Sequence, residues 1–485
     1  MGDRRVLFGC IRRSLVFVAA ILTAFLIIDY APPAIALPSY ARQTGQPCGT
    51  CHTDFAGLTP YGRLFKIQGY TAGGGAYRST LFPTADDPGA AKPYAPPLAM
   101  MTVVGYSNTA TPISPPSAPF NGNNNIALSS VNFMYGGAIT EHIGTFAQFS
   151  YNGQPAGGFG GDPFGQSWTW DNTDIRYADS VRLGGANIIY GLTANNNPTV
   201  QDPWNTTPAW AFPYVSSPFG AGLGPTPIID GAFAQHVAGF GAYTFINDAL
   251  YLEASMYGTL SANGQVHLGA DPFSAPGLID GGAPYWRVAF EPHWGNSWLE
   301  VGTFGMYARI NPWASLPSAP GTGVPVTFTF GTFPQTDNYT DLGFDTQYQY
   351  QGDNFWVTLR GSYIHEFQQL NASFANGLST NPSDVLNEAR AYASLAYGNY
   401  NRIVLTGQYF TSWGTTDLLF EGGSPNTKGW IAEIAYIPFS MNQSPLWPWF
   451  NVRIGLQYTA YTEFNGTAVG ASANNSLFLY LWAAM

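Results

Sequence analysis

The sequence has 485 residues, with 10% charged and 16% aromatic residues and a formal net charge of −11 at pH 7. Typical soluble domains carry roughly 25% charged residues, so this composition does not fit an ordinary cytoplasmic enzyme, and the acidic balance argues against nucleic acid as a partner. Few charges and many aromatic residues, without long apolar runs, fit a barrel whose outer face meets lipid and whose interior meets water. A large secreted β-solenoid or sandwich is the alternative.

The first 36 residues predict a secretory signal peptide. Four arginines precede an apolar run at residues 15–28, and residues 34–36 form a small-x-small cleavage site. This run is short for a membrane-spanning helix, which needs about 20 residues, although an uncleaved anchor remains an alternative. No other apolar run has spanning length, so any membrane insertion has to use strands. Cys10 lies in the signal, which leaves Cys48 and Cys51 as the cysteines of the mature chain.

Residues 48–52 read Cys-Gly-Thr-Cys-His, the C-x-x-C-H pattern of covalent haem attachment. Two thiols at this spacing reach the two vinyl groups of one haem, and the adjacent histidine can turn onto the iron. We therefore predict one haem c, held by Cys48 and Cys51, with His52 as its proximal iron ligand. Three alternatives stay open: a Cys48–Cys51 disulfide, a thioredoxin-like redox pair without its βαβ context, and a zinc site with three local ligands.

A short helix is predicted after the motif, because Thr59 can cap it, Pro60 suits its first position and Gly69 can end it. Its apolar face either covers one side of a porphyrin or forms an ordinary small core, and it comprises Tyr61, Leu64 and Phe65. The module predicted at residues 37–75 has too little apolar mass to fold alone. It therefore needs the rest of the protein as its housing.

Beyond a Gly- and Pro-rich linker at residues 76–96, segments of period two recur to the C-terminus. In the clearest segment, 341–351, Leu342 and Phe344 share one face, while Asp341 and Asp345 share the other. About sixteen strands are predicted, starting near residues 98, 126, 143, 172, 185, 231, 248, 284, 297, 340, 354, 387, 401, 427, 449 and 476. Tight turns, at 140–142, 184, 247–248, 295–296, 352–353 and 399–400, alternate with long connections, at 108–125, 154–171, 195–230, 261–283, 310–339 and 368–386.

Short turns on one side and long loops on the other are typical of outer-membrane barrels. We predict an all-β fold in which residues 97–485 form an outer-membrane barrel of about sixteen strands. The α-helical cytochrome module acts as its plug at the periplasmic side. Without a plug, a barrel of this size is wide enough for an aqueous channel.

Alternation also predicts which charged residues face the lumen, because a charge facing lipid costs roughly 2–4 kcal/mol at the midplane. The predicted set is Glu253, Arg287, Glu291, Glu300, Asp345, Glu388, Arg390, Arg402, Glu433 and Arg453. These side chains either create a polar or ion-conducting interior, or simply pair with one another.

Several stretches together resemble one known family, the fused monohaem cytochrome–porins that act as iron(II) oxidases in the outer membrane of iron-oxidising bacteria. The resemblance rests on residues 38–45 before the motif and on residues 58–63, 65–66 and 69–70 after it. A second resembling stretch comprises residues 195–202, 204–205 and 208–210. The length and the barrel organisation also agree, so the resemblance extends over nearly the whole chain.

The resemblance implies an iron(II) oxidoreductase of the iron:cytochrome c reductase type. Extracellular Fe(II) would give an electron through the single haem to a periplasmic cytochrome c or cupredoxin. Two alternatives remain: a porin or transporter in which the haem module is a structural or redox-sensing plug, and a conduit that carries electrons outward. The sequence does not identify the sixth iron ligand. Position and parity place Met134 and His293 in the periplasmic half of the lumen, Met306 in the outer half, His142 in a turn, His267 in a loop and His365 at the outer rim.

Overall fold

The computed structural model describes residues 38–72, 97–113, 120–152, 168–312, 335–398, 402–420, 422–439, 446 and 448–485. The predicted signal peptide at 1–36 and the predicted linker at 76–96 lie outside these residues, as does the predicted turn at 399–400. No helix in the described ranges is long and apolar enough to cross a membrane.

Strands dominate the described residues. They are β1 Leu98–Thr109, β2 Asn125–Ala138, β3 Ile143–Asn152, β4 Trp168–Leu183, β5 Ala186–Asn195, β6 Val237–Ile246, β7 Leu250–Thr259, β8 Gly277–Ile279, β9 Ala283–Phe290, β10 His293–Trp294, β11 Ser297–Pro312, β12 Asp337–Gln351, β13 Phe355–Gln369, β14 Ser383–Tyr397, β15 Ile403–Gly414, β16 Thr427–Tyr436, β17 Asn451–Glu463 and β18 Ser476–Ala484. The helices are α2 Pro38–Thr44, α3 Cys48–Cys51, α4 Pro60–Ile67, α5 Ala262–His267 and α6 Asn371–Ala375.

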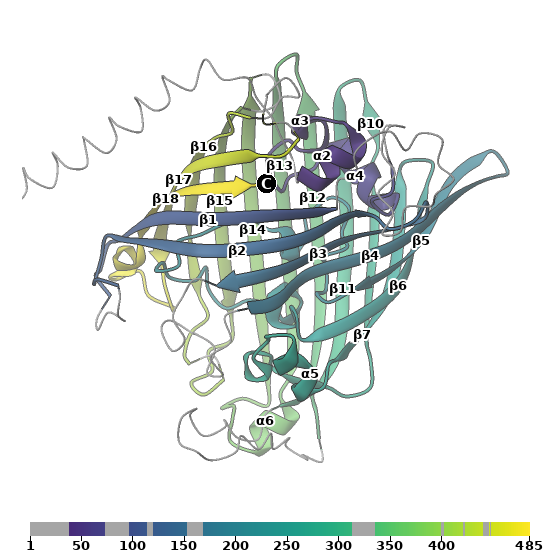
Figure 1. Cartoon of the computed structure of the whole chain (residues 1–485). Coiled ribbons are helices and arrows are strands. Elements are labelled where there is room, and N and C mark those ends of the chain that lie inside the picture. Colours follow the sequence, from purple (N-terminus) through teal and green to yellow (C-terminus); the bar gives the residue numbers. More distant parts are fainter. Residues whose placement is uncertain are drawn as a thin grey trace, which may run out of the picture.

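The strands close into a barrel with sixteen positions around its circumference (Figure 1). Because β8, β9 and β10 pair in turn with successive stretches of β11, they form one interrupted strand. Each strand pairs antiparallel with the next along the chain, and β18 pairs with β1 to close the circle. The predicted fold of about sixteen strands is confirmed.

Connections differ in length at the two ends of the barrel. Tight turns join β4 to β5 and β6 to β7 at the end that also holds α2, α3 and α4, which we call the turn end. Helices α5 and α6 belong to long connections at the opposite, loop end (Figure 1). In outer-membrane barrels the short turns face the periplasm and the long loops face outward, which gives this barrel its orientation.

The predicted strand starts agree with the structure to within four residues, with one exception. Strand β6 begins at Val237 instead of near residue 231. The preceding residues, Ile228–Ala232, still form a helical turn, whose backbone N–H groups at Ile228 and Ile229 donate to wall carboxylates. The strand therefore starts only after this turn has ended.

The predicted alternation is also observed. In β12, Leu342 and Phe344 are 44% and 58% exposed on the outer face, while Asp341 and Asp345 are buried on the inner face. The charged residues predicted to face the lumen are buried, apart from Arg390 and Arg402, which are half-buried. Leucine, phenylalanine and valine side chains cover the outside of many strands. This apolar outer surface is that of a barrel spanning the outer membrane.

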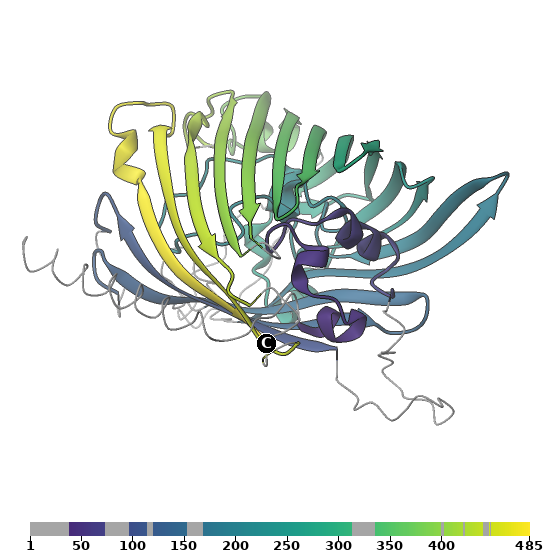
Figure 2. The ribbon, with the colours of Figure 1, turned by 90° about the horizontal axis from the view of Figure 1, so that it is seen from above.

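The helical segment lies inside the barrel near the turn end (Figure 2). It contacts the wall on several sides, because Tyr40 donates to the carbonyl of Thr145 in β3 and Gln349 in β12 donates to the carbonyl of Leu58. Tyr243 in β6 donates to the carbonyl of Ile67. The predicted position of this segment inside the barrel, near the turn end, is thus observed.

One connection differs from its expected course. Residues 195–230 were expected to form a long outer loop, but residues 196–236 fold back into the lumen and are largely buried. Trp204 is fully buried, packing against Tyr251 of β7. We call residues 196–236 the inward loop. Its polar side chains find hydrogen-bond partners on the inner wall, and these partners are not encoded near it in the sequence.

Phe344 lies at the middle of β12, so Phe344→Arg should destabilise the membrane-inserted barrel by about 2–4 kcal/mol. The matched change Tyr350→Arg, near the turn end of the same strand, should cost about 0–1 kcal/mol. Urea unfolding of both variants in lipid vesicles measures the difference. Equal losses at the two positions would contradict the assigned lipid-facing surface.

Candidate functional site

The two helices around the C-x-x-C-H motif are built by local signals. Thr59 caps α4 by accepting from the backbone N–H of Gly62 at 3.2 Å, and Pro60 fills the first helical position. Gly69 has a φ of +69° just after the helix, as its predicted role in ending it requires. A side chain at Gly62 would overlap the carbonyl oxygen of Cys51. The missing β-carbon therefore lets α4 lie directly against α3.

Buried ion pairs join the helical segment to the wall. Asp54, in the turn after α3, pairs with Arg453 of β17, which also pairs with Glu433 of β16. Arg63 of α4 pairs with Glu291 at 2.8 Å and donates to the side chain of Gln349 at 2.6 Å. Each of these charges has a partner of opposite sign, as burial demands.

The inward loop is the second support of the helical segment. Lys66 of α4 donates to the carbonyl of Val200 at 2.7 Å and to the side chain of Asn205 at 3.1 Å. Asn205 in turn donates to the carbonyl of Ala56 at 2.8 Å. The loop therefore connects two parts of the segment, the α3–α4 connection and α4 itself.

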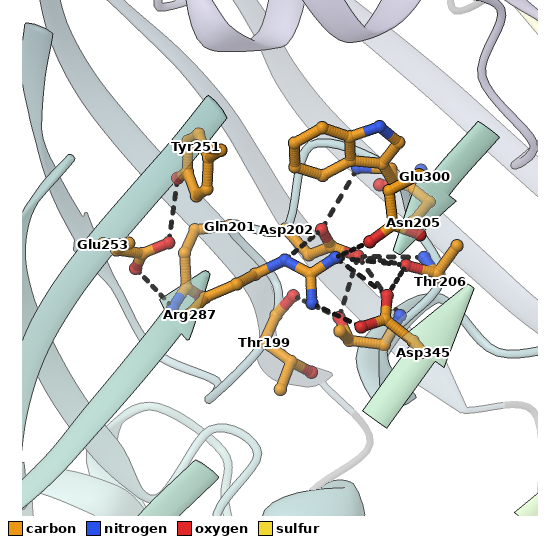
Figure 3. Close-up of polar contacts among 12 residues, drawn as sticks. Thr199, Gln201, Asp202, Asn205, Thr206, Tyr251, Glu253, Arg287, Glu300 and Asp345 are labelled. Atoms are coloured by element: carbon orange, nitrogen blue, oxygen red, sulfur yellow. Dashed lines mark hydrogen bonds and ion pairs between the residues drawn. The ribbon is translucent and has the colours of Figure 1, made fainter. Parts of the chain in front are cut away.

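A network centred on Arg287 fixes the inward loop to the wall (Figure 3). The Arg287 guanidinium lies 2.9 Å from Asp202 of the loop, 2.8 Å from Asp345 of β12 and 3.3 Å from Glu300 of β11. Close by, Gln201 of the loop donates to Glu253 of β7 at 2.9 Å. The lumenal charges of this network are therefore paired with one another and with the loop.

A cavity of about 460 Å³ lies between the helical segment, the inward loop and the wall. This volume lies in the range of ligand pockets, roughly 300–1,000 Å³. Its lining is mostly apolar and aromatic, with polar groups of β2, β3 and β4 on one side. Representative lining residues are Phe65 of α4, Trp210 and Tyr214 of the inward loop, Met134 of β2 and Trp482 of β18.

The structure brings two of the three predicted haem-binding residues to this cavity. Cys51 and His52 line it, while Cys48 is buried one turn earlier, packed with Ala41 against Phe439 and Phe450. Both thiols are free. One histidine and one thiol that line an apolar cavity fit a covalently attached haem in their donor chemistry. Cys48 does not line the cavity in this structure, so its thiol would have to move toward the cavity to form its thioether bond with the haem.

Burial sets the protonation of these groups. It lowers the pKa of His52 to about 4, so the ring is neutral near pH 7, the form in which imidazole binds a metal. It raises the pKa of Cys51 to about 12 and that of Cys48 well above its usual range. A thioredoxin-like pair needs a stabilised thiolate, so these buried thiols disfavour that alternative. Among the described residues, no group of three His, Cys, Asp or Glu side chains could hold a metal ion.

The predicted apolar face of α4 is only partly correct. Phe65 lines the cavity, but Leu64 packs toward the cluster of Ile67 and Trp204, and Tyr61 is exposed toward the turn end. Protein surrounds the helix on several sides, so its apolar side chains pack against different parts of the structure. Tyr40 and Tyr70 also line the cavity and were not singled out from the sequence, although both belong to the stretches that carry the family resemblance.

Of the candidates for the sixth iron ligand, Met134 lines the cavity. His293 lies in β10, opposite Trp298 of β11 and in the same register as β9, but it is exposed near the turn end and does not line the cavity. Met306 faces inward but belongs to an apolar cluster with Ile228 and Phe304. His142 and His267 are exposed, and His365 is hydrogen-bonded to Asn387.

No family model and no curated protein matches the chain. Solved structures similar to it include an anion-selective porin from Comamonas acidovorans, with 10% identity, a TM-score of 0.43 and coverage of 80% of this chain and 98% of the porin. OprB of Pseudomonas putida has 11% identity and a TM-score of 0.43, covering 80% and 92%. OmpT of Vibrio cholerae has 11% identity and a TM-score of 0.38, covering 80% and 96%. At these scores the similarity carries no argument about function, and the barrel assignment rests on the strand pairing.

Arg453→Gln should destabilise the protein by about 3–5 kcal/mol, because it leaves the carboxylates of Asp54 and Glu433 buried without their cation. The added change Asp54→Asn should restore part of this loss. As a control, Lys428→Gln removes the largely exposed pair with Glu463 and should change stability little. Urea unfolding in vesicles compares the variants, and equal effects of Arg453→Gln and Lys428→Gln would refute the buried clamp.

Proposed function

We propose that this protein is an outer-membrane cytochrome that oxidises extracellular Fe(II). It passes the electron through one haem c, attached at Cys48 and Cys51 and ligated by His52, to a periplasmic cytochrome c or cupredoxin. The observation that carries this proposal is the cavity inside the barrel, into which Cys51 and His52 of the C-x-x-C-H motif are directed. The resemblance to fused cytochrome–porins supplies iron as the electron donor.

A haem bound here would supply a one-electron carrier. The chain's own residues hold it and exclude water from it. His52 is positioned by α3 and by the contact of Gly62 with Cys51, while Phe65 and Trp210 cover the cavity from the helical segment and from the inward loop. The lumen-facing Arg287 and Arg453 are each paired with buried carboxylates, which balances these two charges inside the barrel.

The position of the cavity along the barrel sets the distance that an electron from the outer surface has to cross. On β2 the cavity extends from Met134 to Ser130, and Ser130 lies five residues from the loop end of this strand at Asn125. Five residues span about 17 Å along a strand. On the other side, α3 lies at the turn end. The cavity therefore lies toward the turn end, and other groups have to carry the electron over the remaining distance from the loop end.

Aromatic contacts lead from the cavity toward the loop end. Tyr214 in the cavity wall packs against Phe212 with ring centroids 5.4 Å apart, and Phe212 packs against Tyr392 at 5.5 Å. The same apolar cluster contains Tyr461, which contacts Phe464 in the connection after β17 at 5.3 Å. Closely packed rings leave small through-space gaps, so this series of contacts supports an electron route from the outer surface.

A second candidate function is that of a porin or transporter in which the helical segment is a structural or redox-sensing plug. It is supported by the closed barrel of sixteen strands, which is wide enough for a channel when empty. An outward electron conduit is less favoured, because the chain has one C-x-x-C-H motif and hence a short relay.

The iron-oxidation proposal predicts that Fe(II), added without oxygen, reduces the haem of the purified protein. His52→Ala and Cys48→Ala should abolish this reduction, because they remove the iron ligand and one covalent attachment. His142→Ala, in an exposed turn, should leave it unchanged. Absorption spectra report the redox state, and mass spectrometry reports haem attachment. An intact haem spectrum without reduction at any pH from strongly acidic to neutral would reject iron oxidation and favour the plug.

The plugged lumen predicts low ion conductance in planar bilayers. Arg63→Gln combined with Arg453→Gln removes the two cations that clamp the helical segment to the wall, so conductance should rise severalfold. Lys428→Gln is the matched control, since its ion pair lies at the surface. Large open-pore currents from the unaltered haem-loaded protein would overturn the plug.

A further inference from the structure

The cavity contains a small number of side chains able to bind haem iron. Haem proteins use histidine, cysteine, methionine and tyrosine as axial ligands, and a lysine amine is a further nitrogen donor. Besides Cys51 and His52, the lining residues with such groups are Tyr40, Lys66, Tyr70, Met101, Met134 and Tyr214. These six side chains differ in whether their donor atoms already serve another partner.

Four of the six donors are engaged in hydrogen bonds. The Tyr40 hydroxyl donates to the carbonyl of Thr145 at 2.9 Å, and the Tyr70 hydroxyl donates to Asp174 at 2.7 Å. Lys66 donates to the inward loop, as described above. The Tyr214 hydroxyl accepts from Arg360 at 3.3 Å. Ligation by any of them would leave a buried polar group without its partner, which costs free energy. Two thioethers remain.

The two methionines have different surroundings. Met101 packs against the apolar cluster that includes Val103 and Trp482, so its burial has an ordinary explanation. Met134 belongs to none of the apolar clusters formed by the described residues, although it is only 4% exposed. Its nearest neighbour across to β3 is Gln148, which is hydrogen-bonded to Asn132 at 3.0 Å. Met134 is thus a soft sulfur donor in a polar part of the cavity wall.

The strand that carries Met134 is fixed to the helical segment that carries His52. The Gln43 side chain of α2 accepts from the backbone N–H of Ala138 in β2 at 2.8 Å and donates to the carbonyl of Tyr70 at 2.7 Å. Gly137 of β2 has no room for a side chain beside Gln43 and Pro97. These contacts fix the position of β2 relative to the helical segment. Two axial ligands that come from different parts of a chain need such a fixed relative position.

From this arrangement we propose that Met134 is the second axial ligand of the haem iron, on the face opposite His52. The inference rests on the proposed haem function and adds to it. A methionine ligand raises the reduction potential of a haem relative to two histidines. A higher potential makes the haem a better acceptor of electrons from Fe(II). A residue of the barrel wall would then help to set the reduction potential of the haem.

Met134→Leu tests the proposal, because it keeps the size and apolarity of the side chain and removes the sulfur. The variant should lose the weak long-wavelength charge-transfer band of sulfur-ligated ferric haem and should have a lower reduction potential. Met101→Leu, in the same cavity, and Met306→Leu, in a separate cluster, should keep both properties. Met134→His should keep a six-coordinate haem with a lowered potential, so it also tests the site if the leucine variant folds poorly.

Retention of the band in Met134→Leu, its loss in Met101→Leu, or its absence from the unaltered protein would overturn Met134 as ligand. These outcomes leave iron oxidation standing if Fe(II) still reduces the haem. Failure of the unaltered protein to bind haem covalently, detected by mass spectrometry, would overturn both the haem function and the ligand.

Discussion

The buried ion pairs between the helical segment and the barrel wall are the interactions on which the rest of the structure depends. Asp54 with Arg453 and Arg63 with Glu291 take charges out of water, and such charges are tolerated only when they are paired. The helical segment is too small to build its own apolar core. The wall therefore supplies both its counter-charges and its packing, and the position of α3 and α4 follows from the positions of β9, β16 and β17.

The same dependence extends to the cavity. Its lining comes from the helical segment, from the inward loop and from strands at both ends of the chain, including β1, β2 and β18. None of these parts encloses it alone, and β18 meets β1 only when the barrel closes. The Arg287 network adds a further condition, because it seats the loop on β9, β11 and β12. A cofactor attached to the segment would gain its final surroundings only at the last step of assembly.

The barrel was predictable from the sequence because its physical rules are local. Period-two alternation gave the strand starts and the inward charges, since a charge facing lipid is too costly to tolerate. The N-terminal cap of α4 at Thr59 and its end near Gly69 were also predictable from local sequence signals. The inward course of residues 196–236 was not, because its partners, such as Arg287 and Glu253, lie far along the chain.

The paired interior also bears on what can cross the barrel. An ion passing through the lumen would have to displace partners from Arg287, Arg453 or Arg63 and would leave buried charge unbalanced along its way. An electron needs no such displacement, because it requires only carriers and closely packed groups between them. In the proposed function, a haem in the cavity beside His52 would be the carrier, and the rings from Tyr214 toward Phe464 would be the packed groups. Under the proposed function, a barrel filled in this way would stay closed to ions while it lets electrons pass, which would suit a donor whose oxidised product precipitates outside the cell.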